Sequence, residues 1–331
     1  MPKLLKNILQ YTILFLVGAG ILWYVVKDYD LDKLLSDLLK ADFSWIILSM
    51  VIGFIAHYSR ALRWNLLLET TEHYPSGPKT FLAVMSGYFA NLFAPRAGEV
   101  VRCLMLNRME RIPVTTGIGS VVAERVFDFI CLLLLIGLTF VVEFSHISSF
   151  LGSFFVEKFS TIGSKLAHSY IILAIIALIF IGIIYALWRF REWLLSHAFT
   201  QKILGFMKSL WEGVISIVKL KKRVQFIAHT ILIWTCYYLM AYILFFALPG
   251  MEHLGIGVGL VVLVVGGLGM SAPVQGGIGV YHAFVASALV LYGVKYEQGL
   301  VFAFLAHTSQ AVFTIIIGGT SFIAALLLTK K

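Results

Sequence analysis

Charged residues are scarce in this sequence of 331 residues. Asp, Glu, Lys and Arg together make up 13% of the chain, whereas hydrophobic residues make up 60%. A soluble domain carries about 25% charged residues and about 45–50% apolar ones. The composition excludes an ordinary soluble protein, because only a lipid solvent accommodates so much apolar surface.

Cysteine is also scarce, and the familiar catalytic motifs are missing. The three cysteines, Cys103, Cys131 and Cys236, are widely spaced in or beside apolar runs, so they form neither a disulfide framework nor a metal-binding pattern. The sequence has no Walker loop, no HExxH, no GxSxG and no DxD-like sugar-nucleotide motif. We predict no metal site, no cofactor and no ATPase activity, and the residues leave open whether the chain is an enzyme.

Long apolar runs are abundant. At about 20 residues per crossing, the chain has room for six to eight membrane passes and no second soluble domain of useful size. The first run follows a basic start without a cleavage site, which predicts a retained helix. The runs cover residues 11–26, 45–59, 80–94, 117–142, 170–188, 226–248, 256–272, 280–291 and 300–328.

Short polar breaks interrupt the apolar sequence at two places. Pro95 and Gly98 lie in the first break, and Pro273, Gly276 and Gly277 lie in the second. Proline removes a backbone donor and glycine loosens a helix, so each break predicts a re-entrant helical hairpin with these residues as hinges.

The net charge of +9 indicates orientation in a membrane. With both termini in the cytoplasm, a topology of six crossings and two hairpins places 19 basic residues inside and 6 outside, Arg125 being set aside. This agrees with the positive-inside rule, and the basic residues lie in short loops, so we expect no nucleic-acid partner. We predict an all-α polytopic protein of about six transmembrane helices. These helices form one integral membrane domain over residues 1–331, and we expect the protein in a bacterial or archaeal cytoplasmic membrane.

The two breaks also resemble each other. GYFANLFAPRAGEVVRCLML, which starts at Gly87, and GGLGMSAPVQGGIGVYHAFV, which starts at Gly266, share an apolar approach, an Ala-Pro pair, a loop and an apolar exit. We predict inverted repeat units at about 80–142 and 255–328, an arrangement typical of secondary transporters. Chance recurrence in a glycine-rich chain is the alternative. A further stretch, about 202–223, has the pattern of an amphipathic helix in the membrane interface.

Ionisable residues inside the apolar runs are the candidate site, because each costs at least about 2.5–3.5 kcal/mol in the hydrocarbon layer. Arginines bind phosphate bidentately, and neighbouring carboxylates balance or relay charge. The primary candidates for binding or charge relay are Arg96, Glu99, Arg102, Glu124, Arg125 and Asp128. The secondary candidates are His57, Arg60, Arg63, Gln275, His282, His307 and Gln310.

Some of these candidates have a structural alternative. Arg60, Arg63 and Arg102 fit helix-end anchors whose side chains reach the lipid headgroups. His282 and His307 fit hydrogen-bonded core histidines. Glu124, Arg125 and Asp128 are harder to explain in this way, because three ionisable groups are more than one ion pair needs.

Four motifs occur in order along the chain. They are RALRW at Arg60, the loop of Pro95, Gly98 and Glu99, GIGSVVAERVFDF with Glu124, Arg125 and Asp128, and APVQGGIGVYHAFVASALVLYGV with Pro273 to Gly279. In these motifs, and over about residues 4–328, the sequence resembles the flippase-like membrane-domain family, found as the transmembrane region of lysylphosphatidylglycerol synthases and in stand-alone bacterial and archaeal relatives. The resemblance implies translocation of a lipid, such as an aminoacylated phosphatidylglycerol, between leaflets.

In the full synthases a cytoplasmic transferase domain follows the membrane region. This chain ends at Lys331 directly after its last apolar run, so we expect no aminoacyl transfer, and the lipid stays open. We favour the hypothesis that the protein is a translocase for a phosphate-bearing lipid, which can be aminoacylated or glycosylated. Its expected partners are membrane lipids with anionic or phosphate headgroups and a separate lipid-modifying enzyme. The alternatives are a membrane-embedded transferase acting on a lipid or polyprenyl-phosphate carrier, and a membrane partner of a separate synthase.

Overall fold

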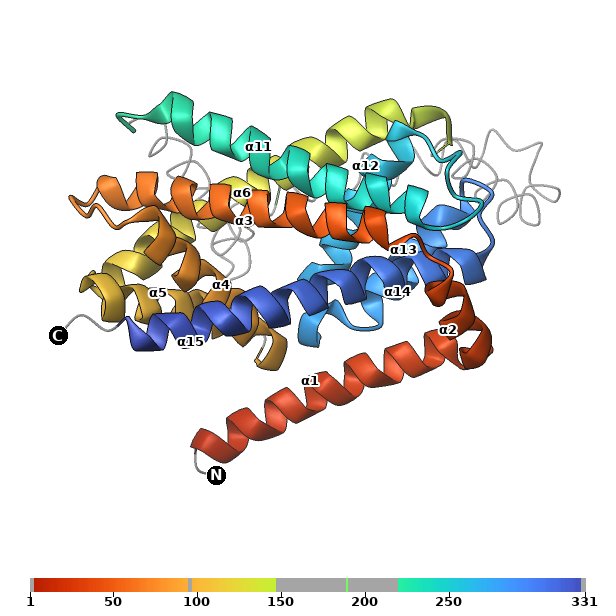
Figure 1. The fold of residues 1–331 in the computed structure, drawn as a ribbon, viewed down its shortest axis with the longest axis horizontal. Coiled ribbons are helices and arrows are strands. Elements are labelled where there is room, and N and C mark those ends of the chain that lie inside the picture. Colours follow the sequence, from red (N-terminus) through yellow and green to blue (C-terminus); the bar gives the residue numbers. More distant parts are fainter. Residues whose placement is uncertain (1–2, 95–96, 147–188, 190–219, 329–331) are drawn as a thin grey trace. The chain divides into compact units, whose positions relative to one another are not determined.

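The computed structural model of the protein describes residues 3–94, 97–146, 189 and 220–328, and these residues form helices and connecting turns without a strand (Figure 1). The predicted all-α fold is therefore confirmed. The chain divides into two compact units, Met1–Glu143 with Val218–Lys331, and Phe144–Ile217. All helices below belong to the first unit. The apolar run at 170–188 lies outside the described residues, and so does nearly all of the interfacial helix predicted at 202–223.

Most helices of this unit coincide with the apolar runs. They are α1 (Lys3–Val26), α2 (Leu31–Leu39), α3 (Phe43–Glu69), α4 (Gly77–Phe93), α5 (Ala97–Glu110), α6 (Val114–Val142), α11 (Arg223–Tyr242), α12 (Ile256–Ser271), α13 (Val280–Val290), α14 (Tyr296–Phe313) and α15 (Gly319–Leu327). Short 3-10 helices cover Ile243–Ala247 and Gln275–Gly277, and a π-helical turn, Thr314–Gly318, joins α14 to α15.

Four helical stretches among the described residues are long and apolar enough to cross a membrane, which makes the protein a polytopic membrane protein. They are Phe43–Glu69, Val114–Val142, Arg223–Ala247 and Tyr296–Leu327. The bent pair formed by α1 and α2, with 88° between its helices, is a fifth candidate. The total of about six crossings and the single domain over 1–331 stay predictions.

The first break turns the chain back on itself. A Cβ atom added to Gly87 of α4 would lie 2.6 Å from the carbonyl oxygen of Gly98 in α5. At the other end of the pair, Lys79 Nζ lies 3.0 Å from Glu110 Oε1. Helices α4 and α5 are therefore antiparallel, and their backbones touch next to the break because glycine supplies no side chain there.

The second break likewise turns the chain back, so that the backbones of α12 and α13 come into close contact. A Cβ on Gly269 of α12 would lie 2.8 Å from Cα of Tyr281 in α13. Between the helices, φ is +59° at Gly276, +70° at Gly277 and +81° at Gly279. Glycine adopts this left-handed region without the Cβ clash that other residues meet. The sequence of this loop thus permits the tight reversal.

The last span, formed by α14, the π-turn and α15, passes both helix pairs. A Cβ on Gly299 of α14 would lie 3.1 Å from Cα of Ala286 in α13, whereas one on Gly318 would lie 3.0 Å from the carbonyl oxygen of Met85 in α4. In Figure 1, α13 accordingly lies beside α14, and α4 and α5 lie beside α15. The two pairs approach the middle of this span from opposite ends, as an inverted repeat requires. A common origin of the two units stays a prediction.

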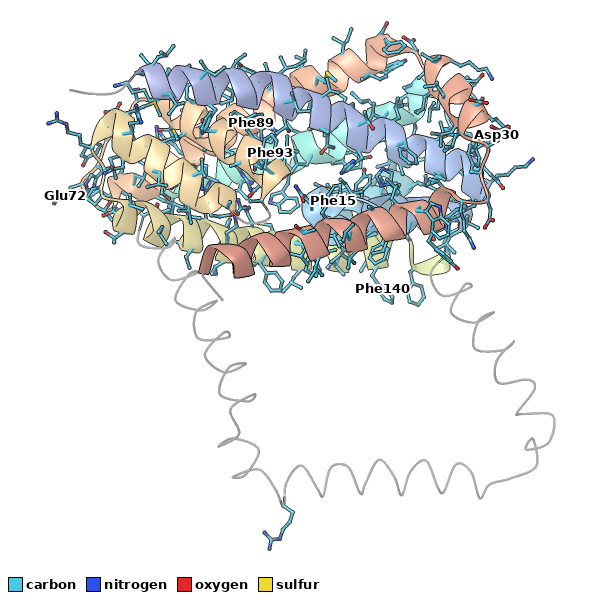
Figure 2. All side chains as sticks on the ribbon, turned by 90° about the horizontal axis from the view of Figure 1, so that it is seen from below. Phe15, Asp30, Glu72, Phe89, Phe93 and Phe140 are labelled. Carbon is cyan, nitrogen blue, oxygen red and sulfur yellow. The ribbon has the colours of Figure 1, made fainter. Side chains whose placement is uncertain are left out.

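Helix α1 runs along the outside of the bundle, where Figure 2 shows it with Phe15 and, at the following turn, Asp30. Its backbone abuts the second break. A Cβ on Gly18 would lie 3.4 Å from the carbonyl oxygen of Ile278, and one on Gly279 would lie 2.7 Å from the backbone nitrogen of Leu22. The second break is therefore packed between α1 and the bundle.

Candidate functional site

Five charged side chains from three helices form a buried ion cluster. Glu124 Oε1, on α6, lies 3.3 Å from Nε of Arg60 and 3.3 Å from Nη2 of Arg63, both on α3. Asp128 Oδ1 accepts a hydrogen bond from Arg63 Nη2 at 2.6 Å, and its Oδ2 accepts one from Arg60. Arg102 of α5 completes the cluster, with Nη1 3.0 Å from Glu124 Oε2.

The spacing along each helix explains why these groups meet. Residues three or four apart share one helix face, so Arg60 and Arg63 point from α3 as a pair, and Glu124 and Asp128 point from α6. Glu124 lies ten residues after Val114, the first residue of α6. The five side chains expose between 0 and 10% of their surface. Charges so deep in an apolar helix need these partners, because an unpaired one is strongly destabilising.

Neutral groups hold the cluster in place. Trp64 Nε1 donates to Ser120 Oγ at 2.8 Å, which joins α3 to α6. The guanidinium carbon of Arg102 lies 4.7 Å from the centroid of the Trp64 ring, within the range of a cation–π contact. Arg63 Nη1 donates to Thr230 Oγ1 of α11 at 3.3 Å. Four helices are thereby tied to the same set of arginines.

A cavity of about 570 Å³ lies beside the buried ion cluster. Its volume is within the range of about 300–1,000 Å³ that small-molecule sites occupy. Tyr88 links the cavity to the cluster, because its side chain lines the wall and its hydroxyl accepts a hydrogen bond from Arg60. The polar residues of the wall are Ser49, His57, Tyr88, Asn91, Glu99, Arg125, Ser271, Gln275, His307, Ser309, Gln310 and Thr314.

Arg125 and Glu99 are the two charged residues of that wall. Arg125 Nη2 lies 3.4 Å from Glu99 Oε1, and its Nη1 lies 3.7 Å from Asp128 Oδ2. The side chains are 41% and 32% exposed, in contrast with those of the buried ion cluster. Within the described part of the chain, Arg125 Nε and Glu99 Oε2 have no hydrogen-bond partner. These two atoms are buried, so it is the remaining, exposed part of the two side chains that a ligand can reach.

The two breaks meet at this cavity. Gln275 Nε2 donates to the carbonyl oxygens of Leu92 at 2.7 Å and Phe93 at 2.9 Å. These are the last residues of α4, whose carbonyls have no partner within their own helix. The amide of the second break thus completes the hydrogen bonding of the first.

Two histidines fix the rest of the second break. His307 Nε2, on α14, donates to the carbonyl oxygen of Gly276 at 2.7 Å. His282 Nδ1, in the first turn of α13, accepts from the backbone nitrogen of Gly279 at 3.3 Å. Their ring centroids are 4.9 Å apart. The second break is therefore anchored at both of its glycine turns.

Comparison with known proteins places this architecture in a family. A family described as the lysylphosphatidylglycerol synthase TM region matches residues 9–318. The chain belongs to this family. The chain is also similar to curated proteins that are described as UPF0104 membrane proteins. The one from Methanothermobacter thermautotrophicus is 33% identical over 88 residues, which are 26% of this chain and only 25% of that protein. The one from Pyrococcus horikoshii is 22% identical over 307 residues, 84% of this chain and 90% of that protein. No solved structure matches the chain.

The primary candidates in this member of the lysylphosphatidylglycerol synthase TM region family occupy two distinct places. Glu99 and Arg125 line the cavity, whereas Arg102, Glu124 and Asp128 belong to the buried ion cluster. Arg102 is 3% exposed and faces Glu124 and Trp64. Two further predicted residues, Pro95 and Arg96, lie outside the described residues. Of the predicted hinges, Gly98 lies in the first turn of α5, and Pro273, Gly276 and Gly277 lie in the second break.

The secondary candidates also separate. Arg60 and Arg63 are not helix-end anchors, because their side chains are 6% and 0% exposed and pair with carboxylates. His282, 2% exposed, is a hydrogen-bonded core histidine. The cavity wall contains the remaining four, His57, Gln275, His307 and Gln310.

Sequence reasoning missed several polar residues of the cavity. Tyr88 and Asn91 lie three residues apart on α4, about two turns and one turn before the first break, respectively, and this spacing could have marked them as one polar face. Ser49 is a single polar residue in an apolar helix and carries no such signal. Nothing in the sequence identified Trp64 as the ring beneath Arg102.

Proposed function

We propose that this protein moves a phosphate-bearing lipid between the two leaflets of a membrane, and that the cavity receives the lipid headgroup. One observation carries the proposal. The side chain of Arg125 is 41% exposed and lines a 570 Å³ cavity, about midway along helix α6, whereas the carboxylates of Glu124 and Asp128 on the same helix are buried in ion pairs. A cation that is partly exposed at a cavity is better placed to bind a ligand than to stabilise the fold.

The geometry of Arg125 suits an exchangeable anion. Its ion pairs with Glu99 and Asp128, at 3.4 and 3.7 Å, are longer than a charge-assisted hydrogen bond of about 2.7–2.9 Å. Two oxygens of a phosphate have the spacing that the guanidinium fork recognises with two parallel hydrogen bonds. The headgroup phosphate takes the place of Glu99 at Arg125, and Glu99 returns when the headgroup leaves, so Arg125 is paired at both stages.

The buried ion cluster supplies a fixed background for this exchange. It contains three arginines and two carboxylates, so its net charge is +1 (3 − 2). This excess of positive charge next to the cavity favours an anionic group over a neutral one. Because its members hold α3, α5 and α6 together, Arg125 and Glu99 are presented from a rigid support.

The family description supports the choice of ligand. Lysylphosphatidylglycerol is a phosphate-bearing lipid, and the family takes its name from the synthase of this lipid. We propose that the lipid of this chain shares the phosphate, which is the group that Arg125 recognises.

The test is transport in reconstituted liposomes. Fluorescent phosphatidylglycerol, phosphatidylethanolamine and lysylphosphatidylglycerol are incorporated in turn, and an impermeant reductant quenches only the outer leaflet. We expect the wild-type protein to expose the inner pool faster than empty liposomes do, and Arg125→Ala to abolish the gain. Arg223→Ala is the matched control, because it removes one arginine that is exposed at the start of α11. If the wild type is no faster than empty liposomes for every lipid, the proposal is wrong.

A further inference from the structure

The contact between the two breaks forms one side of the cavity. Leu92 and Gln275 both line the cavity, and they are hydrogen-bonded to each other. Phe93, the next residue, is hydrogen-bonded to the same amide but is 65% exposed. The Gln275 amide therefore lies at the boundary between the inside of the cavity and the outside of the described unit.

Water can replace the Gln275 amide as the hydrogen-bond donor to the carbonyls of Leu92 and Phe93. Carbonyls at a helix end inside a membrane need a donor, because an unsatisfied carbonyl costs several kcal/mol there. When Gln275 turns away, the carbonyls of Leu92 and Phe93 accept hydrogen bonds from water that enters between the breaks. The number of hydrogen bonds is unchanged by this exchange, so the closed and open arrangements can be close in free energy.

The rest of the second break does not depend on this contact. Gly276 is held by His307, and Gly279 is held by His282, from two other helices. The left-handed φ angles start at Gly276, directly after Gln275. The Gln275 side chain can therefore turn away while the following glycine turn stays anchored. The fold of this loop does not require the contact with α4, as expected for a gate.

We propose that the lipid headgroup enters and leaves the cavity between the end of α4, at Leu92 and Phe93, and the second break, and that the Gln275 amide is the gate that closes this path. The inference rests on the proposed function for the identity of the passing group. The gate itself is defined by the two hydrogen bonds to α4 and by the position of Gln275 on the cavity wall.

Access to the cavity is measurable without lipid transport. Ser309, 8% exposed, lines the cavity, so Ser309→Cys places a thiol inside. The protein is labelled with a water-soluble methanethiosulfonate, and the labelling of the parent chain with its three native cysteines is subtracted. Gln275→Glu keeps the shape of the side chain and removes both donors, because a carboxylate only accepts. We expect labelling to accelerate on the order of tenfold, as the loss of two hydrogen bonds implies.

The control is the same glutamine-to-glutamate substitution at an exposed position. Gln298→Glu lies in the exposed first turn of α14 and should leave the labelling rate unchanged. If Gln275→Glu fails to fold, Gln275→Ala removes the amide without adding charge and gives the same comparison. Equal labelling of the folded Gln275 variant and the parent overturns the gate, whatever the transport rate.

A cross-link tests the closed state. Leu92→Cys combined with Gln275→Cys, joined by a short bismaleimide, should stop lipid transport, whereas either cysteine alone should not. Transport that continues through the cross-linked protein overturns the path between the breaks. A wild type that moves no lipid, together with faster labelling of Gln275→Glu, leaves the gate standing and refutes the proposed function instead.

Discussion

Nη1 of Arg102 lies 3.0 Å from Oε2 of Glu124, and this ion pair ties the first helix pair to α6. The other carboxylate oxygen of Glu124 faces Arg60 and Arg63 of α3. One side chain, fully buried, thus faces arginines from two other helices.

Neutralising Glu124 should be strongly destabilising. Glu124→Gln leaves three buried arginines with Asp128 as the sole carboxylate of the cluster, and we expect the free energy of unfolding to fall by about 3–5 kcal/mol, as for other broken buried ion pairs. Denaturant unfolding in detergent measures the loss. Glu110→Gln is the control, because its partner Lys79 is 33% exposed and such a pair contributes about 0–1 kcal/mol. Equal unfolding of the two variants would contradict the stabilising role of Glu124.

The close approach of α4 and α5 should depend on glycine. In Gly87→Ala the added Cβ would lie 2.6 Å from the carbonyl oxygen of Gly98 and 3.1 Å from Cβ of Arg102, so the two helices must separate. We expect a loss of about 1–3 kcal/mol, typical of an overpacked site. Gly119→Ala, on α6, meets no atom within 4 Å and should keep or raise the melting temperature. A Gly87→Ala protein that melts like the wild type would show that the helices adapt without cost.

Arginine-to-lysine exchange should separate support from binding. Arg102→Lys removes the stacked guanidinium over Trp64, so we expect a lower melting temperature. Arg125→Lys keeps the charge at the cavity wall but loses the bidentate fork, so transport should fall about tenfold while the melting temperature stays near that of the wild type. Both variants are measured in the same liposome and detergent preparations. Transport retained in Arg125→Lys would indicate that only the positive charge matters.

Removing His307 should loosen the second break. His307→Ala leaves the carbonyl oxygen of Gly276 without its donor, a loss of about 1–3 kcal/mol for a buried group. Hydrogen exchange followed by mass spectrometry should show faster exchange in peptides that cover the second break. His253→Ala, at an exposed position, is the control. Unchanged exchange across this loop would mean that Gly276 does not rely on the histidine.

Local patterns in the sequence predicted much of the fold. Helices end at the proline-containing breaks, because proline lacks the backbone donor that a helix needs. Spacings of three and four residues correctly placed Glu124 with Asp128 on one helix face. The partners of these carboxylates were not predictable, because spacing within α6 does not reveal which helix lies opposite. Arg60 and Arg63 were therefore secondary candidates, although they form two of the three ion pairs around Glu124.

The cavity was harder to predict than the cluster for a related reason. It is assembled from side chains of α3, α4, α5, α6, α11, α12 and α14, and most of these helices contribute only a few polar residues. A lone serine such as Ser49 in an apolar helix is common in membrane proteins and has no partner in its own segment. Only the tertiary arrangement shows that it lines the same cavity as Arg125.

The central position of Glu124 divides the described unit into two mechanically different halves. Neither α3 nor α5 can slide along α6 without leaving a buried carboxylate unpaired, so the first half is a stiff frame. Across the second break, the hydrogen bonds described here are neutral ones from Gln275, His282 and His307. We therefore expect the second half to be the more deformable one, and the movement that the proposed transport requires to be concentrated there.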